Sequence, residues 1–590
     1  MASPPTTLTT LPFEMRRQIF VHAFKVDGGY AFNGDSEKLT MADGKPINFS
    51  LMYTCRSIAN DTKGMPLSVN TINFSTVYRR DWSAVAGCFN YVRFFYRLLQ
   101  EDLILRLAPF MTADMYSELG QRHPEFVAQL QNQSTKHEKI MRIWARGQFN
   151  IREEGAAQGN AFMWGPSKLR LRHHSYPGLG HMDNPGDLLD RLYGPTWEAE
   201  QITSYCLRFL AEKEPAEFSR LVYEALPQWV DKHPADEFLD LMFPPWAIPS
   251  RAEMANMTSR LEANNAWELV ESWHPGTSEP YNQTRGSETW TATGLQCREK
   301  IRFSAAAVAI RFLKQLPIDQ RLQVRQVTLH ENLPAVCTPS VHAEGLAPFF
   351  KENQRLQVER RVSVLRCIVE ENRLQNLVYP GKLGGPNDIP RFLQDPNSLR
   401  FHCRASMNTQ WFSERLAIWL LEALAVLDAN IPAESFTFVL EGKPWVDFCS
   451  DLFQQVVHRD VAWQNAFEAS VDRGYVLSRS KLRFAHDRLE GAMEHLSKQT
   501  SILRSDFNTG HSWDIEPIIE KNRLLNERFR WRNAHGYPIR FMDFPPPLDL
   551  TNILLDHYEI QTKAECGERE DVRETVAEDG LNDEITQGHG

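Results

Sequence analysis

The chain has 590 residues, more than a single hydrophobic core usually serves, so several packed units are expected. With 42% hydrophobic and 24% charged residues, its composition is that of an ordinary globular protein. A net charge of −10 argues against a general affinity for nucleic acid or for anionic membranes.

Nine cysteines are scattered along the chain without any C-x-x-C pair. An odd number without paired spacing is typical of reduced, mostly buried thiols. Residues 1–10 lack the basic start and the apolar run of a signal peptide. We therefore expect an intracellular protein, cytoplasmic or nuclear.

After a start at residues 1–9 that is expected to be disordered, a short apolar helix is predicted for residues 11–24, LPFEMRRQIFVHAF. Pro12 suits its first position, where a missing N–H costs nothing, and Glu14 faces the positive end of the helix dipole. At about 100° per residue, one broad face gathers the apolar side chains of Met15, Ile19, Phe20, Ala23 and Phe24. The same spacing places Arg16 among them, where its guanidinium must extend past apolar surface or meet an acid.

A second amphipathic helix is predicted for residues 50–64, with Ser50 as its N-cap. Its apolar face would consist of Leu51, Cys55, Ile58, Ala59 and Thr62. Asp61 in this helix is the acid that we expect to meet Arg16. Residues 70–77 then alternate through Ile72 and Phe74, which predicts a strand.

Residues 10–80 resemble a known group of domains. LPFEMRRQIF resembles the Leu-Pro-x-Glu-hydrophobic-Arg opening of F-box and F-box-like domains, and the longer run is similar to an F-box-like group common in filamentous fungi. The matching residues are the E-x-R pair, a Cys-Arg helix start and an N-T-x-F strand: Glu14, Arg16, Cys55, Arg56, Asn70, Thr71 and Phe74. The sequence departs from the pattern in its long loop at 25–46 and in Asp61, where Glu is usual.

The resemblance implies that the opening helices bind the small adaptor subunit of cullin-RING ubiquitin ligases. The residues expected to dock this partner are Leu11, Pro12, Glu14, Met15, Arg16, Ile19, Phe20 and Phe24. By pattern alone, the first helix is more typical of an ordinary core helix, and the motif raises docking only to parity with that interpretation. An adaptor requires part of its apolar surface to stay exposed, whereas a helix used only for packing would be fully covered.

The remaining chain is expected to be helical at 96–290, with a long loop at 152–187, and mixed helix and strand at 291–560. Residues 411–429 are the most apolar stretch, but charged side chains interrupt it, so a buried helix is predicted instead of a membrane span. Residues 274–288 and 379–390 are rich in Gly and Pro and predict loops. Residues 561–590 predict a disordered acidic tail.

Residues 304–368 are the most regular part of the body and are predicted to alternate helix, strand, helix, strand. Ser304 stands at an N-cap position and Pro317 ends the first helix. In the second strand Leu356, Val358, Val362 and Val364 alternate, and Arg360 intrudes on their face. Two helix-strand units in succession favour neighbouring parallel strands joined by a helical crossover.

Residues that could support chemistry are few. A group within fifteen residues invites a metal hypothesis, but its H-E-x5-C-x4-H spacing matches neither a zinc finger nor H-E-x-x-H: His330, Glu331, Cys337, His342 and Glu344. His173, His174, His181 and Asp183 share a Gly-Pro loop, which does not preorganise ligands. No hydrolase elbow, dinucleotide fingerprint, phosphate-binding loop or kinase motif is found. We therefore predict no metal, no cofactor and no enzymatic activity.

A basic and aromatic stretch at residues 521–541 could stack on nucleic acid, but its spacing is that of an amphipathic helix with a basic face. That face could instead meet an acidic partner or the acidic tail.

The sequence as a whole predicts a mainly α fold with minor β (α+β). An F-box-like docking element at 10–95 would be followed by a large helix-rich body that contains helix-strand units. The expected function is that of a non-enzymatic adaptor, which recruits an unidentified protein target to a cullin-RING ubiquitin ligase. The alternative is a structural or interaction protein that keeps the F-box-like fold only as a packing module.

Overall fold

The computed structural model describes residues 8–131, 134, 197–271, 273–275, 295–369, 406–476, 484–486, 488–536, 541–543 and 555–562. The predicted loops at 152–187 and 379–390, and all of 274–288 but its first two residues, lie outside the described residues, as does most of the predicted tail. Two predictions of disorder are wrong in part. Residues 8 and 9 belong to a 3-10 helix, η1 (Leu8–Thr10). Residues 561 and 562 belong to strand β12 (Tyr558–Thr562).

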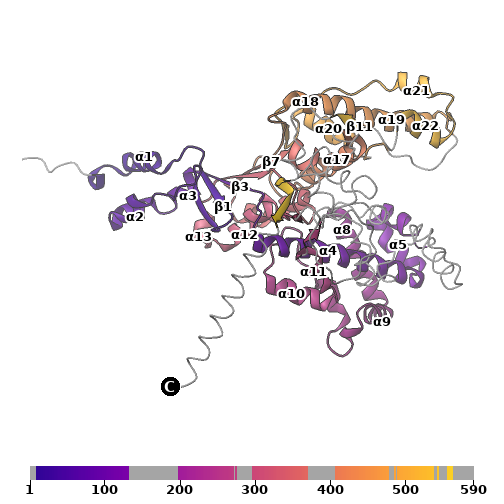
Figure 1. Ribbon diagram of the computed structural model, residues 1–590, viewed down its shortest axis with the longest axis horizontal. Coiled ribbons are helices and arrows are strands. Elements are labelled where there is room, and N and C mark those ends of the chain that lie inside the picture. The colour runs from indigo at the N-terminus through magenta and orange to yellow at the C-terminus, as the bar shows by residue number, and fades with distance from the viewer. Residues whose placement is uncertain are drawn as a thin grey trace, which may run out of the picture.

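The N-terminal helices form an arm that extends away from the rest of the molecule (Figure 1). It contains α1 (Phe13–Phe24), η2 (Ser50–Tyr53), α2 (Arg56–Thr62) and α3 (Met65–Val69). The single helix predicted for 50–64 is wrong, because the Thr54 hydroxyl donates to the Leu51 carbonyl at 2.8 Å and the backbone turns extended at Cys55. Cys55, and not Ser50, is therefore the N-cap of α2.

Asn70, the first residue of the N-T-x-F stretch, is buried and links two helices of the arm. Its amide nitrogen donates to the carbonyls of Phe24 and Pro66 at 2.8 and 3.0 Å. Its carbonyl oxygen accepts the N–H of Val26 at 2.8 Å. This buried side chain thus joins the end of α1 to α3, satisfying backbone groups that a helix end leaves open.

A seven-stranded sheet forms the centre of the molecule, in the order β10-β9-β7-β6-β3-β1-β2. Its strands are β1 (Tyr30–Asn33), β2 (Lys38–Met41), β3 (Thr71–Ser75), β6 (Gln326–Glu331), β7 (Gln357–Ser363), β9 (Phe436–Glu441) and β10 (Leu503–Ser505). β2 is antiparallel to β1, and every other neighbouring pair is parallel. The predicted helix-rich character is confirmed, but the mostly parallel seven-stranded sheet makes the fold α/β overall, which corrects the α+β class with minor β.

The sheet also crosses the predicted domain boundaries. β1, β2 and β3 come from the expected docking element at 10–95, yet β3 pairs directly with β6 of the body. The boundary at residue 95 falls inside the long helix α4 (Arg80–Leu107). The loop at 25–46, too long for a compact F-box, contains the β1–β2 hairpin that extends the sheet.

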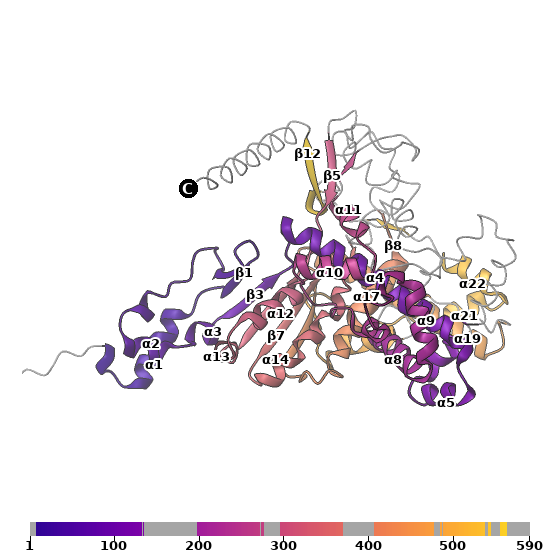
Figure 2. The ribbon, with the colours of Figure 1, turned by 90° about the horizontal axis from the view of Figure 1, so that it is seen from below.

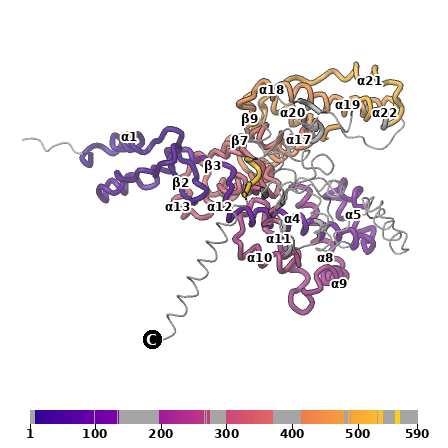
Figure 3. The backbone as a smooth tube through the Cα atoms, viewed as in Figure 1, coloured from indigo at the N-terminus to yellow at the C-terminus, as the bar shows by residue number. Residues whose placement is uncertain are grey.

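Four connections join the strands from β3 onward. Most of their described helices gather in two lobes away from the N-terminal arm, whereas α12 and α13 lie beside the strands (Figure 3). Between β3 and β6 lie α4, η3 (Ala108–Phe110), α5 (Ala113–Arg122), α8 (Trp197–Lys213), α9 (Pro215–Ala225), η7 (Pro227–Trp229), η8 (Ala235–Asp240), α10 (Arg251–Arg260), α11 (Asn265–Glu271), β4 (His274–Pro275), β5 (Leu295–Glu299), α12 (Ala305–Gln315) and α13 (Ile318–Arg321). Later connections hold η9 (Pro339–Leu346), α14 (Ala347–Glu352), η10 (Val364–Val369), β8 (Ser406–Asn408), α17 (Thr409–Ala425), α18 (Val446–Leu452), η12 (Phe453–Val457), α19 (His458–Asp472) and α20 (Leu489–Lys498). After β10 come α21 (Glu516–Asn522), α22 (Arg528–His535), β11 (Phe541–Asp543) and β12.

The order of the parallel strands decides which face of the sheet is covered. β1, β3, β6, β7, β9 and β10 lie side by side in chain order. Parallel crossovers are right-handed almost without exception, so crossovers that all step in one direction pass over the same face. α12 packs on that face through Phe312 against Phe74, with ring centroids 5.5 Å apart, and α17 through Trp419 against Phe438 at 6.4 Å. Figure 2 shows α12 and α14 in front of β7 on this side.

Several predictions for the body are confirmed. α12 begins after Ser304, whose hydroxyl accepts the N–H of Ala307 at 3.0 Å. β6 and β7 are neighbouring parallel strands, as the two helix-strand units favoured. Residues 411–429 fall largely within α17, which is mostly buried. The single basic helix predicted for 521–541 is wrong, because the chain there forms α21 and α22, and Trp531 is fully buried.

Arg360, which intruded on an apolar strand face in the sequence, has a buried partner. Its guanidinium donates to Glu331 Oε1 at 2.8 Å and to the Ser340 carbonyl at 2.8 Å. The Glu331 carboxylate in turn accepts the N–H of Ala305 at 3.0 Å, the first residue of α12. One ion pair therefore joins β6, β7, η9 and the N-terminus of α12, where negative charge is favoured.

Among the described residues, none of the helices combines the length and the apolar character needed to cross a lipid bilayer. Six cysteines in the described part of the chain are free thiols, and all but Cys55 are buried, as the sequence predicted.

Candidate functional site

α1 divides its apolar residues between two directions. Phe20 and Phe24 are 0% and 3% exposed and pack with Ile58 and Met65 in a small core separate from the main one. The expectation that Phe20 and Phe24 dock a partner is therefore corrected, because a partner cannot reach them. Their role is to hold α1 on α2 and α3.

Two apolar side chains of α1, Met15 and Ile19, point away from that small core and are 53% and 43% exposed. They lie one turn apart and form a stripe that exposed Ala23 continues. We call Met15, Ile19 and Ala23 the N-terminal apolar surface. Phe13 and Tyr53 of the arm are also exposed, but by the helix period Phe13 lies on the same side of α1 as Phe20. Of the other predicted docking residues, Pro12 and Glu14 are exposed, and Leu11 and Arg16 are half-buried.

Arg16 lies beside this surface and meets the acid that the sequence suggested. Its guanidinium is 3.2 Å from the Asp61 carboxylate, with the two side chains 15% and 19% exposed. It also donates to the Thr9 carbonyl at 3.4 Å. The expected pairing is confirmed, and it ties α1 to α2.

A double-mutant cycle tests this pair. We expect Arg16→Met and Asp61→Asn each to lower the free energy of unfolding by about 0.2–1 kcal/mol, because the pair is partly exposed. The double variant should cost less than the two single changes added together. Urea unfolding followed by circular dichroism measures this, and an Arg16→Met variant as stable as wild type would exclude a paired role.

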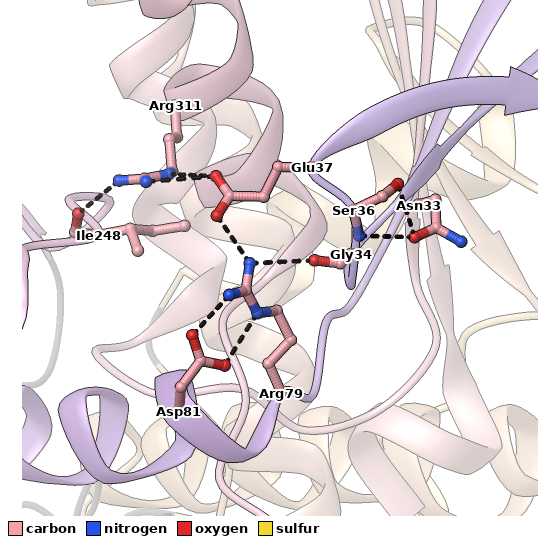
Figure 4. Close-up of polar contacts among 8 residues, drawn as sticks. All are labelled: Asn33, Gly34, Ser36, Glu37, Arg79, Asp81, Ile248 and Arg311. Atoms are coloured by element: carbon pink, nitrogen blue, oxygen red, sulfur yellow. Dashed lines mark hydrogen bonds and ion pairs between the residues drawn. The ribbon is translucent and has the colours of Figure 1, made fainter. Parts of the chain in front are cut away.

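A second group of ion pairs anchors the β1–β2 hairpin to the body (Figure 4). Glu37, in the turn between β1 and β2, accepts from Arg79 at 2.7 Å and from Arg311 of α12 at 3.3 Å. Arg79 also binds Asp81 in the first turn of α4, and the guanidiniums of Arg79 and Arg311 lie 4.5 and 5.3 Å from the centre of the Trp82 ring. These contacts hold the β1–β2 hairpin against α4 and α12.

In the structure, the residues of the metal hypothesis lie in different surroundings. Glu331 is buried against Arg360, and His330 contacts Asn73 on the other face of the sheet, 3.3 Å away. His342 is held between the Ser304 hydroxyl at 2.7 Å and the Cys337 carbonyl at 2.8 Å. In the portion of the chain that the structure describes, no group of three or more His, Cys, Asp or Glu side chains is arranged to hold a metal ion.

The Ser304–His342 contact has the composition of a nucleophile and its base. Both side chains are fully buried, and burial lowers the pKa of His342 to about 3, so its imidazole stays neutral. The Ser304 hydroxyl already caps α12. The pair therefore serves to hold η9 against the start of α12.

The sheet face opposite the helices is polar. We call it the open sheet face and define it by Asn73, Thr328, His330, Glu359, Arg361, Thr437 and Glu441, all of them half-buried. Arg361 donates to Glu359 and Glu441 at 2.5 and 3.3 Å across neighbouring strands. Because parallel sheets are usually covered on both faces, this face is a second candidate contact surface.

Local patterns could find only part of these surfaces. The alternation of β6 and β7 indicates which residues point away from the core, but the parallel order that brings the strands into one face depends on pairings between distant segments.

Comparison of the chain with family models, with curated proteins and with solved structures finds no match to any of them.

Proposed function

We propose that this chain is a non-enzymatic adaptor, whose residues 10–80 form an F-box-like docking element and whose body holds a second protein. The docked partner would be the small adaptor subunit of a cullin-RING ubiquitin ligase, and the chain would act inside the cell. The observation that carries the proposal is the N-terminal apolar surface, which is exposed at the end of an arm directed away from the body (Figure 1).

Exposed apolar side chains grouped in this way are typical of contact surfaces, whereas single ones need no explanation. Met15 and Ile19 supply flexible and branched side chains that can fill apolar hollows on a partner. The Arg16–Asp61 pair and the small core beneath hold the helix that presents them. A preformed surface of this kind loses little conformational entropy when it binds.

The held target is assigned to the open sheet face. Its side chains offer hydrogen-bond donors and acceptors of both charges along several strands, which suits a polar protein surface more than an apolar one. The arm continues from α3 directly into β3, whose Asn73 belongs to this face. Such a connection would keep the target at a constant distance from the docked partner.

One observation favours the alternative, in which the element is only a packing module. Residues 30–75 contribute β1, β2 and β3 to the seven-stranded sheet, so this segment completes the body regardless of any partner. The two hypotheses differ in what happens to Met15 and Ile19. Packing alone gives these exposed side chains no role.

Co-purification of the full chain with a fungal ligase adaptor subunit distinguishes the hypotheses. We expect a stable complex with the wild-type chain, and at least a tenfold weaker one with Ile19→Asp, because a carboxylate would lie in a desolvated contact. Val230→Asp is the matched control, since Val230 is 48% exposed, against 43% for Ile19, and lies outside the arm. Absence of a wild-type complex, or equal binding of Ile19→Asp, would contradict docking and leave the packing module.

A further inference from the structure

A cavity of about 520 Å³ lies between α4, α8 and the segment 239–246, remote from the N-terminal apolar surface. Its walls are formed by one face of each helix, with Asn90, Phe94 and Arg97 on α4 and Trp197, Ser204 and Arg208 on α8. The volume lies in the range of natural small-molecule sites, about 300–1,000 Å³. Neither docking nor target binding as proposed above uses this cavity.

Each of the three walls of the cavity contributes aromatic side chains. Six rings line it: Phe94, Tyr96, Trp197, Tyr205, Phe243 and Trp246. Trp197 and Trp246 pack edge to face, with centroids 5.3 Å apart and planes 63° apart. Rings fixed against one another in this way offer edges and faces to a flat aromatic guest.

The polar groups of the cavity are dominated by guanidiniums, with three arginines against two acids. Arg93 is held by the Phe243 carbonyl at 3.2 Å and by Glu200, which also binds Arg97. Arg208 is held through one terminal nitrogen only, which donates to the Leu239 carbonyl at 2.9 Å and to Asp240. Within the described residues, the Nε and the other terminal nitrogen of Arg208 bind no acceptor, so each can still donate a single hydrogen bond to an anion.

The backbone beside the cavity is strained. Cys337 and Thr338 line it in the left-handed region, with φ of 62° and 57°. Two contacts hold them there: Asn90 accepts the Cys337 N–H at 2.9 Å, and His342 donates to the Cys337 carbonyl at 2.8 Å. Such residues cost about 1–3 kcal/mol each and gather at binding sites.

We propose that this cavity binds a small planar aromatic molecule that carries a carboxylate. The ring system would lie against Trp197 and Trp246, and the carboxylate would accept a hydrogen bond from a nitrogen of Arg208 that binds no other acceptor. The charge of the guanidinium strengthens this hydrogen bond, and the aromatic side chains exclude water from the ring system. A free acidic peptide side chain lacks the ring and would not use the aromatic side chains.

Isothermal titration of the full chain with 2-naphthoate tests the site. We expect saturable binding to one site, and at least tenfold weaker binding of the neutral analogue 2-naphthalenemethanol. Arg208→Gln should weaken naphthoate binding at least fivefold and leave the neutral analogue unchanged. Ser204→Trp, which fills the cavity, should abolish the binding of both compounds.

Arg220→Gln on α9 is the matched control, since its side chain is 54% exposed, lies outside the cavity and also pairs with acids. It should bind both compounds as wild type does. No binding of naphthoate by the wild-type chain would overturn the proposal, as would equal binding by Arg208→Gln. Circular dichroism of each variant shows that it is folded, and because Arg208 is 43% exposed, its substitution tests the site even where Ser204→Trp fails to fold.

Discussion

Replacing Arg360 with Met is expected to lower the free energy of unfolding by about 3–5 kcal/mol, because it leaves the Glu331 carboxylate buried without its partner. The two side chains are 0% and 1% exposed, so water cannot take the place of the guanidinium. The loss also removes the donor to the Ser340 carbonyl in η9. Urea unfolding monitored by circular dichroism measures the change.

Arg361→Met provides the matched control for this prediction. Arg361 is the next residue of β7, but it points to the open sheet face, is 32% exposed and pairs with Glu359 and Glu441. We expect its replacement to cost less than about 1 kcal/mol. If both substitutions lowered the free energy of unfolding equally, the buried Arg360–Glu331 pair would not contribute more to stability than the exposed pairs of Arg361.

The contrast between these arginines shows what the sequence can predict. Alternation in residues 355–364 placed Arg360 on the apolar face, which is where the structure has it. The pattern could not identify Glu331 as the partner, although β6 was predicted, because the register between two strands depends on their pairing. Local periodicity therefore identified Arg360 as unusual, but only the tertiary structure shows that Glu331 is its partner.

The larger error concerns the sheet as a whole. Strands β3 and β6 are neighbours although more than 240 residues of chain separate them, and no local pattern carries that pairing. Taken one at a time, short strands in a helix-rich chain suggest separate units, which is why an α+β body with a boundary at residue 95 was expected. The contacts of Glu37 with Arg311 are of the same long-range kind.

The N-terminal helix was predicted more closely, but its two faces were not separated. A spacing of about 100° placed Met15, Ile19, Phe20 and Phe24 on one broad face. A helix packed on only one side buries less than such a face, so Phe20 and Phe24 turn inward and Met15 and Ile19 remain outside. Which half of the face is covered depends on where α2 and α3 lie, and that follows from Asn70 and the Arg16–Asp61 pair.

Asp102 gives a prediction for the dependence of stability on pH. Its side chain is fully buried in α4, accepts no hydrogen bond from the described residues and has its nearest guanidinium, that of Arg106, 3.9 Å away. Burial raises the pKa of Asp102 to about 8. The folded state therefore keeps a proton that the unfolded state has already released above its ordinary pKa near 4. As pH rises from 5 to 8, this group makes the free energy of unfolding fall.

We expect Asp102→Asn to remove that fall, because an amide of the same shape does not titrate. At pH 5 the variant and the wild-type chain should be about equally stable, and by pH 8 the variant should be the more stable by on the order of 1–4 kcal/mol. Asp114→Asn, at an exposed position in the first turn of α5, is the control and should leave the pH dependence unchanged. Urea unfolding of the wild-type chain and both variants, measured at intervals of half a pH unit, tests this pH dependence. Parallel curves for Asp102→Asn and wild type would mean that Asp102 is already ionised in the fold, and that Arg106 at 3.9 Å suffices to hold its charge.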